Sequence, residues 1–66
     1  MAYISIDVDG TENLSLVLPQ RYYYDQLTQI RGFWNVHNGT LVELEKGSIK
    51  DLIGKTLTWE DEPYEI

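Results

Sequence analysis

The chain has 66 residues and a formal net charge of −6 at neutral pH, because eleven acidic residues outnumber five basic ones. A chain of this length makes one small domain that buries only about 60% of its unfolded surface. The absence of cysteine excludes disulfides and thiolate metal sites, and the negative charge opposes direct binding to nucleic acid or anionic lipid. A hydrophobic fraction of 42%, with eight aromatic side chains, predicts a folded domain.

The acidic residues gather at the two ends of the sequence. Residues 1–20 hold three acids and no base, and residues 56–66 hold four acids and no base. All five basic residues lie between these segments, together with four acids, so the ends carry −7 and the middle +1. This distribution predicts attraction to basic surfaces, among them the nucleic-acid-binding clefts of other proteins.

The first predicted element is a β-hairpin. Residues 3–8 and 14–18 alternate between apolar and polar side chains, which is typical of half-buried strands. The polar residues 9–13, with Asp9-Gly10, supply the turn between them. The side chains expected to face the core are Ile4, Ile6, Val8, Leu14, Leu16 and Leu18.

Residues 20–31 allow two interpretations. Tyr23, Leu27 and Ile30 recur at i, i+4 and i+7, and Gly32 follows as a C-terminal cap, which together predict a helix. The three consecutive tyrosines at 22–24 favour a strand instead. We prefer the helix.

A second hairpin is predicted over residues 33–45. Asn38-Gly39 lies between two strand-forming runs, and this dipeptide favours a two-residue type I′ turn in which both residues have positive φ. The pairing would place Val36 opposite Leu41 and Phe33 opposite Leu44.

The C-terminal third is predicted to hold a short helix, a last strand and a tail. Ser48 to Asp51 resembles a capping box and Gly54 ends the turn, so residues 48–53 should be helical. Residues 55–60 should form the last strand with Leu57 and Trp59 inward. The acidic tail over residues 61–66, which contains Pro63, is expected to fray.

These elements predict a small α+β single domain over residues 1–66. Its order is strand, strand, helix, strand, strand, short helix, strand, with the five strands in one mostly antiparallel sheet. If residues 20–31 form a loop, the same strands could curl into a small SH3-like barrel. That comparison concerns topology alone and carries no function.

One short motif resembles a catalytic site. Ile6 to Thr11, an apolar strand followed by Asp-x-Asp-Gly-Thr, resembles the first motif of haloacid-dehalogenase-type phosphatases, which would make Asp7 a nucleophile and Asp9 a general acid/base. That chemistry also requires a second phosphate-binding loop, a lysine and magnesium-binding carboxylates on a parallel α/β sheet. The segments that follow are typical of antiparallel hairpins, so a turn is the favoured interpretation and no enzyme is expected.

Neither a cofactor nor a metal is expected, since the chain has one histidine, His37, and no cysteine. No segment reaches the ~18 apolar residues of a membrane span, and the N-terminus lacks the pattern of a signal peptide. The expected location is therefore the cytoplasm, or the host cytoplasm if the protein is viral.

The candidate partner-binding residues are the acids of both ends and the tyrosine run. Three consecutive tyrosines cannot all face one way, so at least one ring should be exposed, and exposed tyrosines favour interfaces. If the first and last strands are neighbours, the two acidic ends form one patch. The candidates are Asp7, Asp9, Glu12, Tyr22, Tyr23, Tyr24, Glu60, Asp61, Glu62 and Glu65.

The sequence thus predicts a small acidic, non-enzymatic module that binds a partner protein with a basic surface. Its sharper form is an inhibitor of phage or mobile-element type that imitates DNA and occupies a nucleic-acid-binding site. The alternative is a self-associating structural or accessory subunit of a larger assembly, in the simplest case a homodimer. The thin core and the exposed tyrosines suggest this alternative.

Overall fold

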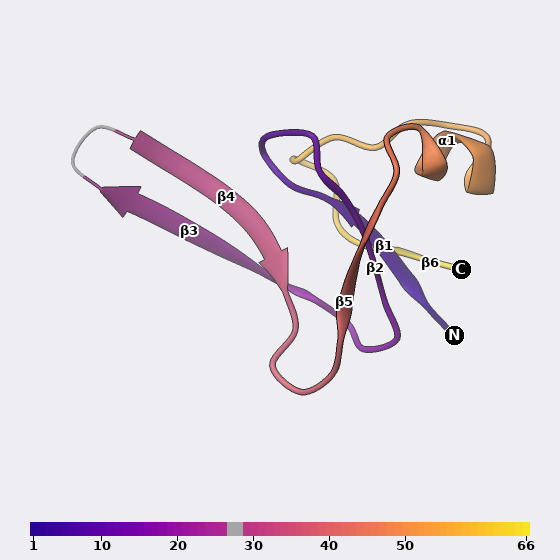
Figure 1. Ribbon diagram of the computed structural model, residues 1–66, viewed down its shortest axis with the longest axis horizontal. Helices are drawn as coiled ribbons and strands as arrows, with labels where there is room; N and C mark the ends of the chain where they lie inside the picture. Colours follow the sequence, from indigo (N-terminus) through magenta and orange to yellow (C-terminus); the bar gives the residue numbers. More distant parts are fainter. Residues whose placement is uncertain (27–28) are drawn as a thin grey trace.

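The chain folds into two antiparallel sheets and a short helix (Figure 1). The computed structural model describes residues 1–26 and 29–66, and the side chains of residues 1–23 and 32–66. In this part of the chain, one sheet has the strand order β5-β2-β1-β6 and the other pairs β3 with β4. The elements are β1 (Tyr3–Ile6), β2 (Glu12–Ser15), β3 (Gln20–Gln26), β4 (Gln29–Asn35), β5 (Leu41–Leu44), α1 (Ser48–Ile53) and β6 (Tyr64–Glu65).

The predicted first hairpin is confirmed. β1 and β2 pair with Ile4 opposite Leu14, and the Asp7 N–H closes the turn by donating to the Thr11 carbonyl at 2.9 Å. Gly10 adopts φ 92°, a left-handed conformation that favours glycine. The Asp9-Gly10 segment is therefore a structural turn, as the sequence indicated.

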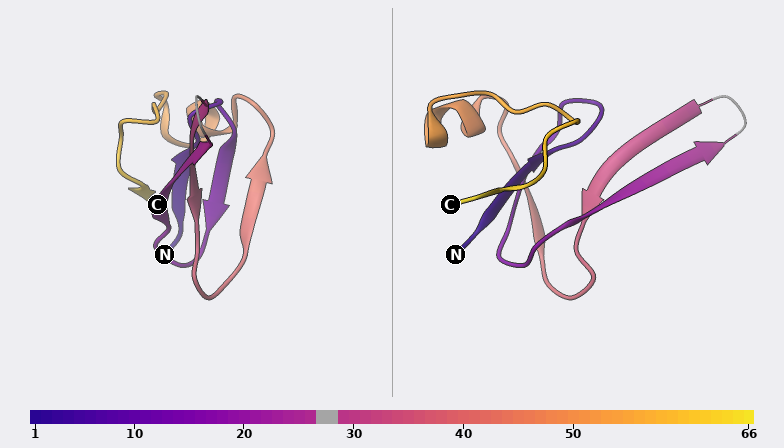
Figure 2. Two further views of the ribbon diagram at one scale, coloured as in Figure 1. Left: turned by 90° about the vertical axis from the view of Figure 1, so that its left-hand side faces the viewer. Right: turned by 180° about the vertical axis from the view of Figure 1, so that it is seen from behind.

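The four-stranded sheet has two faces that are covered by different elements. Ile4, Ile6 and Glu12 lie on the face that contacts α1, which we call the α1 face. Ser5, Asp7 and their cross-strand neighbour Asn13 lie on the opposite face, from which β3 and β4 project; we call it the hairpin face. Figure 2 (left) shows the four strands side by side with β3 and β4 in front of them.

The core is small and lies on both faces of this sheet. Among the described residues, the buried hydrophobic side chains are Ile4, Trp34 and Ile49. Leu16 and Leu18, which were expected to point inward, are exposed, because β2 ends at Ser15 and the chain turns away toward the buried Pro19.

The predicted helix over residues 20–31 is wrong. The backbone forms β3 and β4, which pair with each other in the register Tyr22 to Phe33 and Tyr23 to Gly32. The strand preference of the tyrosine run prevails over a helical spacing that rested on three side chains. Of those three, Leu27 and the side chain of Ile30 lie outside the described residues.

The predicted hairpin over residues 33–45 is also wrong. Phe33 and its neighbours pair with β3, whereas β5 pairs with β2 in the register Leu14 to Val42. The Asn38-Gly39 segment thus connects two different sheets. Gly39 adopts φ 139°, which differs from the value of a type I′ turn.

Helix α1 spans Ser48–Ile53 as predicted, and Gly54 ends it in the left-handed conformation with its N–H donating to the Lys50 carbonyl. Its N-terminal cap differs from the prediction. Gly47 occupies the cap position, and the carboxylate of Glu12 in β2 accepts hydrogen bonds from the Gly47 and Ile49 N–H groups at 2.7 and 2.8 Å. A side chain distant in sequence therefore replaces the Ser48 hydroxyl.

Near the end of the chain, the last strand lies in a different segment from the one expected. Residues 55–60 form no strand, whereas the tail expected to fray contains β6, which pairs with β1. Ala2 and Ile66 exchange two backbone hydrogen bonds of 3.0 and 2.8 Å. The fold is a small α+β single domain, and the described strands do not close into the alternative SH3-like barrel.

Candidate functional site

A recess opens where the β3–β4 hairpin leaves the sheet. Its volume is about 430 Å³, and we call it the notch. Its lining comes from the residues that follow β1 and from the middle of β4. Its lining consists of Asp7, Val8, Asp9, Gly32 and Phe33.

Three hydrogen bonds fix the angle between the hairpin and the sheet. The Val8 N–H donates to the Gly32 carbonyl at 3.0 Å, and the Trp34 N–H donates to Asp7 Oδ1 at 2.8 Å. The Trp34 indole Nε1–H donates to the Ile6 carbonyl at 2.9 Å. Trp34 itself is buried, and together the three bonds hold the walls of the notch in place.

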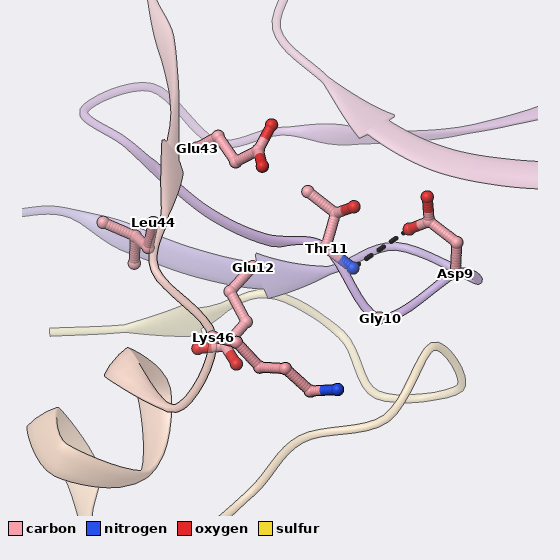
Figure 3. Close-up of a pocket in the computed structure, with 7 residues that line it drawn as sticks. All are labelled: Asp9, Gly10, Thr11, Glu12, Glu43, Leu44 and Lys46. Atoms are coloured by element: carbon pink, nitrogen blue, oxygen red, sulfur yellow. Dashed lines mark hydrogen bonds between the residues drawn. The ribbon is translucent and has the colours of Figure 1, made fainter.

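The floor of the notch is acidic. Burial raises the pKa of Asp7, hydrogen bonds from Trp34 and Asn13 oppose the rise, and the charges of Asp9 and Glu43 add to it. Asp9 lines the notch with Asp7, and Glu43, outside the lining, is near enough for its charge to act on Asp7. Figure 3 shows Asp9 and Glu43 on the same side of the sheet, whereas Glu12 points toward α1. The notch therefore presents concentrated negative charge.

Phe33 forms the wall on the hairpin side and belongs to an aromatic pair. Tyr22 and Phe33 are cross-strand neighbours whose rings stack with centroids 5.6 Å apart and planes 11° from parallel. They remain 38% and 36% exposed. An aromatic face attracts a cation, and carboxylates beside it can bond the same cation. The arrangement suits a guanidinium or ammonium group.

The opposite side of the hairpin is closed by a cation–aromatic cluster. The Arg21 guanidinium lies 4.6 Å from the Trp34 ring and 4.8 Å from the Trp59 ring. It also donates to the Trp59 carbonyl at 2.9 Å. The cluster fastens residues 59–62 to the hairpin.

Two further features complete this closed side. Arg21 donates to the Asp61 carbonyl at 3.2 Å and lies 3.4 Å from the Glu62 carboxylate. Gly32 allows the Trp59 ring to approach, since a Cβ at that position would lie 2.7 Å from ring atoms. This side of the hairpin is therefore packed, in contrast to the notch.

The structure distributes the candidate residues among several places. Asp7 and Asp9 line the notch, Tyr22 stacks on Phe33 beside it, Glu12 caps α1, and Glu65 pairs with Tyr3 at the far end of β1. Residues 60–62 follow Trp59 beside Arg21. Tyr23 packs its ring against the edge of Trp59, and the side chain of Tyr24 lies outside the described residues.

Sequence reasoning missed two residues of the site. The sequence predicts that Phe33 pairs with Leu44 and that Glu43 belongs to the same hairpin, over residues 33–45. The actual register places Glu43 opposite Asn13, whose amide donates to Asp7 at 2.9 Å. Predicting these residues would have required knowing that β2 pairs with β5, and no local pattern in the sequence indicates that pairing.

The described side chains offer no group of three or more His, Cys, Asp or Glu residues arranged to hold a metal ion. Within the same part of the chain, no helix has the length and apolar character needed to span a membrane. No family model matches this chain, and comparisons with curated proteins and with solved structures found no match.

Proposed function

We propose that this protein is a non-enzymatic module that binds a basic segment of a partner protein in the notch. The observation that carries the proposal is that Asp7 and Asp9 line the same recess as the exposed Phe33, whose ring stacks on Tyr22, while the charge of Glu43 also acts on Asp7. A partner arginine would place its guanidinium over Phe33 and direct its N–H groups to Asp9 and Glu43. Lysine would gain the charge contact alone, because it lacks the planar fork of donors.

The expected energies suit a modest, specific contact. A cation–aromatic interaction contributes about 0.5–2 kcal/mol, and a hydrogen bond to a charged group about 1.5–3 kcal/mol. A bound cation would favour the ionised form of Asp7 and lower its raised pKa. Affinity should therefore fall as the pH decreases through the pKa of Asp7.

The net charge supports a finer form of the proposal. A protein of net charge −6 is attracted to basic surfaces, which are common on proteins that bind nucleic acid. We extend the proposal to an inhibitor, of phage or mobile-element type, that competes with nucleic acid for such a surface. Competition between this protein and a DNA duplex for an isolated partner tests that extension.

The notch itself can be tested with a fluorescently labelled octa-arginine peptide at low salt. The double variant Asp9→Asn/Glu43→Gln removes one charge that lines the notch and a second charge that acts on Asp7. The matched control Glu60→Gln/Glu65→Gln removes two charges elsewhere, so both proteins change from −6 to −4. We expect the notch variant to bind roughly tenfold more weakly and the control about twofold more weakly.

A second comparison separates the aromatic wall from the charge. Phe33→Leu keeps an apolar side chain and removes the ring, so we expect a loss of about three- to fivefold in affinity for the peptide. Equal weakening in the two double variants, together with full affinity in Phe33→Leu, would contradict the proposal.

A further inference from the structure

Part of the α1 face is left uncovered. Helix α1 has six residues, about 9 Å of length, and it lies at the end of the sheet marked by Glu12 and Leu44. At the other end, an open groove of about 510 Å³ remains. Its apolar lining comes mainly from Leu14, Leu16, Val17 and Val42, with Gly39 and Thr40 at its rim.

The side chains around this groove are strongly exposed. Leu16 is 76% exposed, Leu18 57% and Val42 48%. Leu16, Val17 and Leu18 form a continuous apolar run, yet the run lies on the surface rather than in the core. Contiguous exposed apolar surface of this kind marks an interaction site.

We propose that this groove is the interface of a homodimer, in which each copy inserts Leu16 into the groove of the other. The surface is self-complementary, because the exposed Leu16 side chain lies beside the groove that would receive Leu16 of the second copy. A two-fold axis between the copies would then form both contacts at once.

The distribution of charge favours the same surface for contact with a second copy. Two copies of net charge −6 repel each other, and they can approach most easily through surface that carries no charge. None of the described residues that line the groove is charged. A second copy is therefore favoured at the groove and opposed at the notch, which lies on the other face of the sheet.

The surface area agrees with a dimer of moderate affinity. The accessible surface is 4870 Å², whereas a monomer of this mass is expected to expose roughly 4,300 Å². The apolar area available to an interface comes from the exposed side chains of the groove and from Leu18. A stable interface buries about 800 Å² per partner, so the apolar centre would be completed by polar groups at the rim.

Sedimentation equilibrium of the full chain from micromolar to millimolar concentration tests the proposal. We expect the average mass to rise from 7.7 kDa toward twice that value, and Leu16→Glu to remain monomeric throughout. Leu52→Glu is the matched control, since Leu52 is 55% exposed on α1, away from the groove, and this variant should dimerise like the wild type. A wild-type monomer at every concentration would overturn the proposal and leave the groove to an unrelated partner.

Cross-linking provides a second readout that does not depend on the charged variant folding. The chain has no cysteine, so Leu16→Cys and Leu52→Cys each report on one position. A short bismaleimide should join two copies of the first variant at least tenfold faster than two copies of the second. Equal rates would contradict the proposed interface. The groove and the notch lie on opposite faces, so these results are independent of the peptide-binding experiment.

Discussion

The four-stranded sheet and the β3–β4 hairpin are built from similar strands but are stabilised differently. The sheet has α1 against one face and the base of the hairpin against the other, and Ile4 at its centre is fully buried. The hairpin projects from the sheet and is held at its base by Trp34 and on one side by Trp59 (Figure 1). Its other side keeps Tyr22 and Phe33 open. The exposed aromatic surface therefore exists because only one side of the hairpin is packed.

The largest expected effect comes from the residue that joins the two regions. Trp34→Ala removes a buried indole, its contacts with Arg21 and Trp59, and its hydrogen bond to the Ile6 carbonyl. We expect it to lower the free energy of unfolding by about 3–5 kcal/mol, which is enough to unfold a domain of this size. Urea denaturation followed by circular dichroism measures the change. An intact sheet with only the hairpin unfolded would show that the regions are independent.

A smaller loss is expected when the sheet loses its contact with α1. Glu12→Ala leaves the Gly47 and Ile49 N–H groups without their acceptor, so we expect a loss of about 2–3 kcal/mol. Glu45→Ala is the control, because Glu45 is an exposed glutamate next to the same helix. Thermal unfolding compares the two variants. Similar melting temperatures in both would refute the role of Glu12 as the cap.

Gly32→Ala tests the packed side of the hairpin. The new methyl group would clash with the Trp59 ring, and we expect a loss of about 1–2 kcal/mol with a shift in tryptophan fluorescence. In a Trp59→Ala background the same substitution should cost almost nothing. An equal cost in both backgrounds would mean that the ring does not occupy this position.

The smallest effect concerns the charge at the junction. The pKa of Asp7 is raised in the folded protein, so the folded state binds more protons than the unfolded chain between pH 3.8 and that raised value. The stability due to Asp7 is therefore fully present below pH 3.8 and is lost as the pH rises through the folded pKa. Asp7→Asn keeps the Oδ1 acceptor and removes the charge. Relative to the wild type it should gain stability with rising pH, by less than about 1 kcal/mol. A relative loss over this range would contradict the raised pKa.

Local signals predicted those parts of the fold that depend on neighbouring residues. The alternation of residues 3–8 and 14–18 gave the first hairpin, and Ser48 to Gly54 gave the bounds of α1. Each of these two elements is stabilised by hydrogen bonds between residues that are near in sequence, even where a distant group also contributes.

The remaining elements depend on partners distant in sequence. The Asn38-Gly39 pair suggested a hairpin, but β5 pairs with β2 and β4 pairs with β3. Gly32 suggested a helix cap, but its role is to admit the Trp59 ring. For the same reason, only part of the notch could be predicted from the sequence. Its acids Asp7 and Asp9 lie in the first hairpin, whereas Phe33 and Glu43 arrive through pairings that no local pattern encodes.

The central claim is that the junction of sheet and hairpin binds a basic segment. Two-dimensional ¹H–¹⁵N NMR of the labelled protein, titrated with the unlabelled octa-arginine peptide, locates the contact directly. We expect the largest chemical-shift changes at the amides of residues 7–9, 32–33 and 43, with little change in residues 60–66. Shifts concentrated on residues 60–66, or spread evenly over all acidic segments, would contradict it.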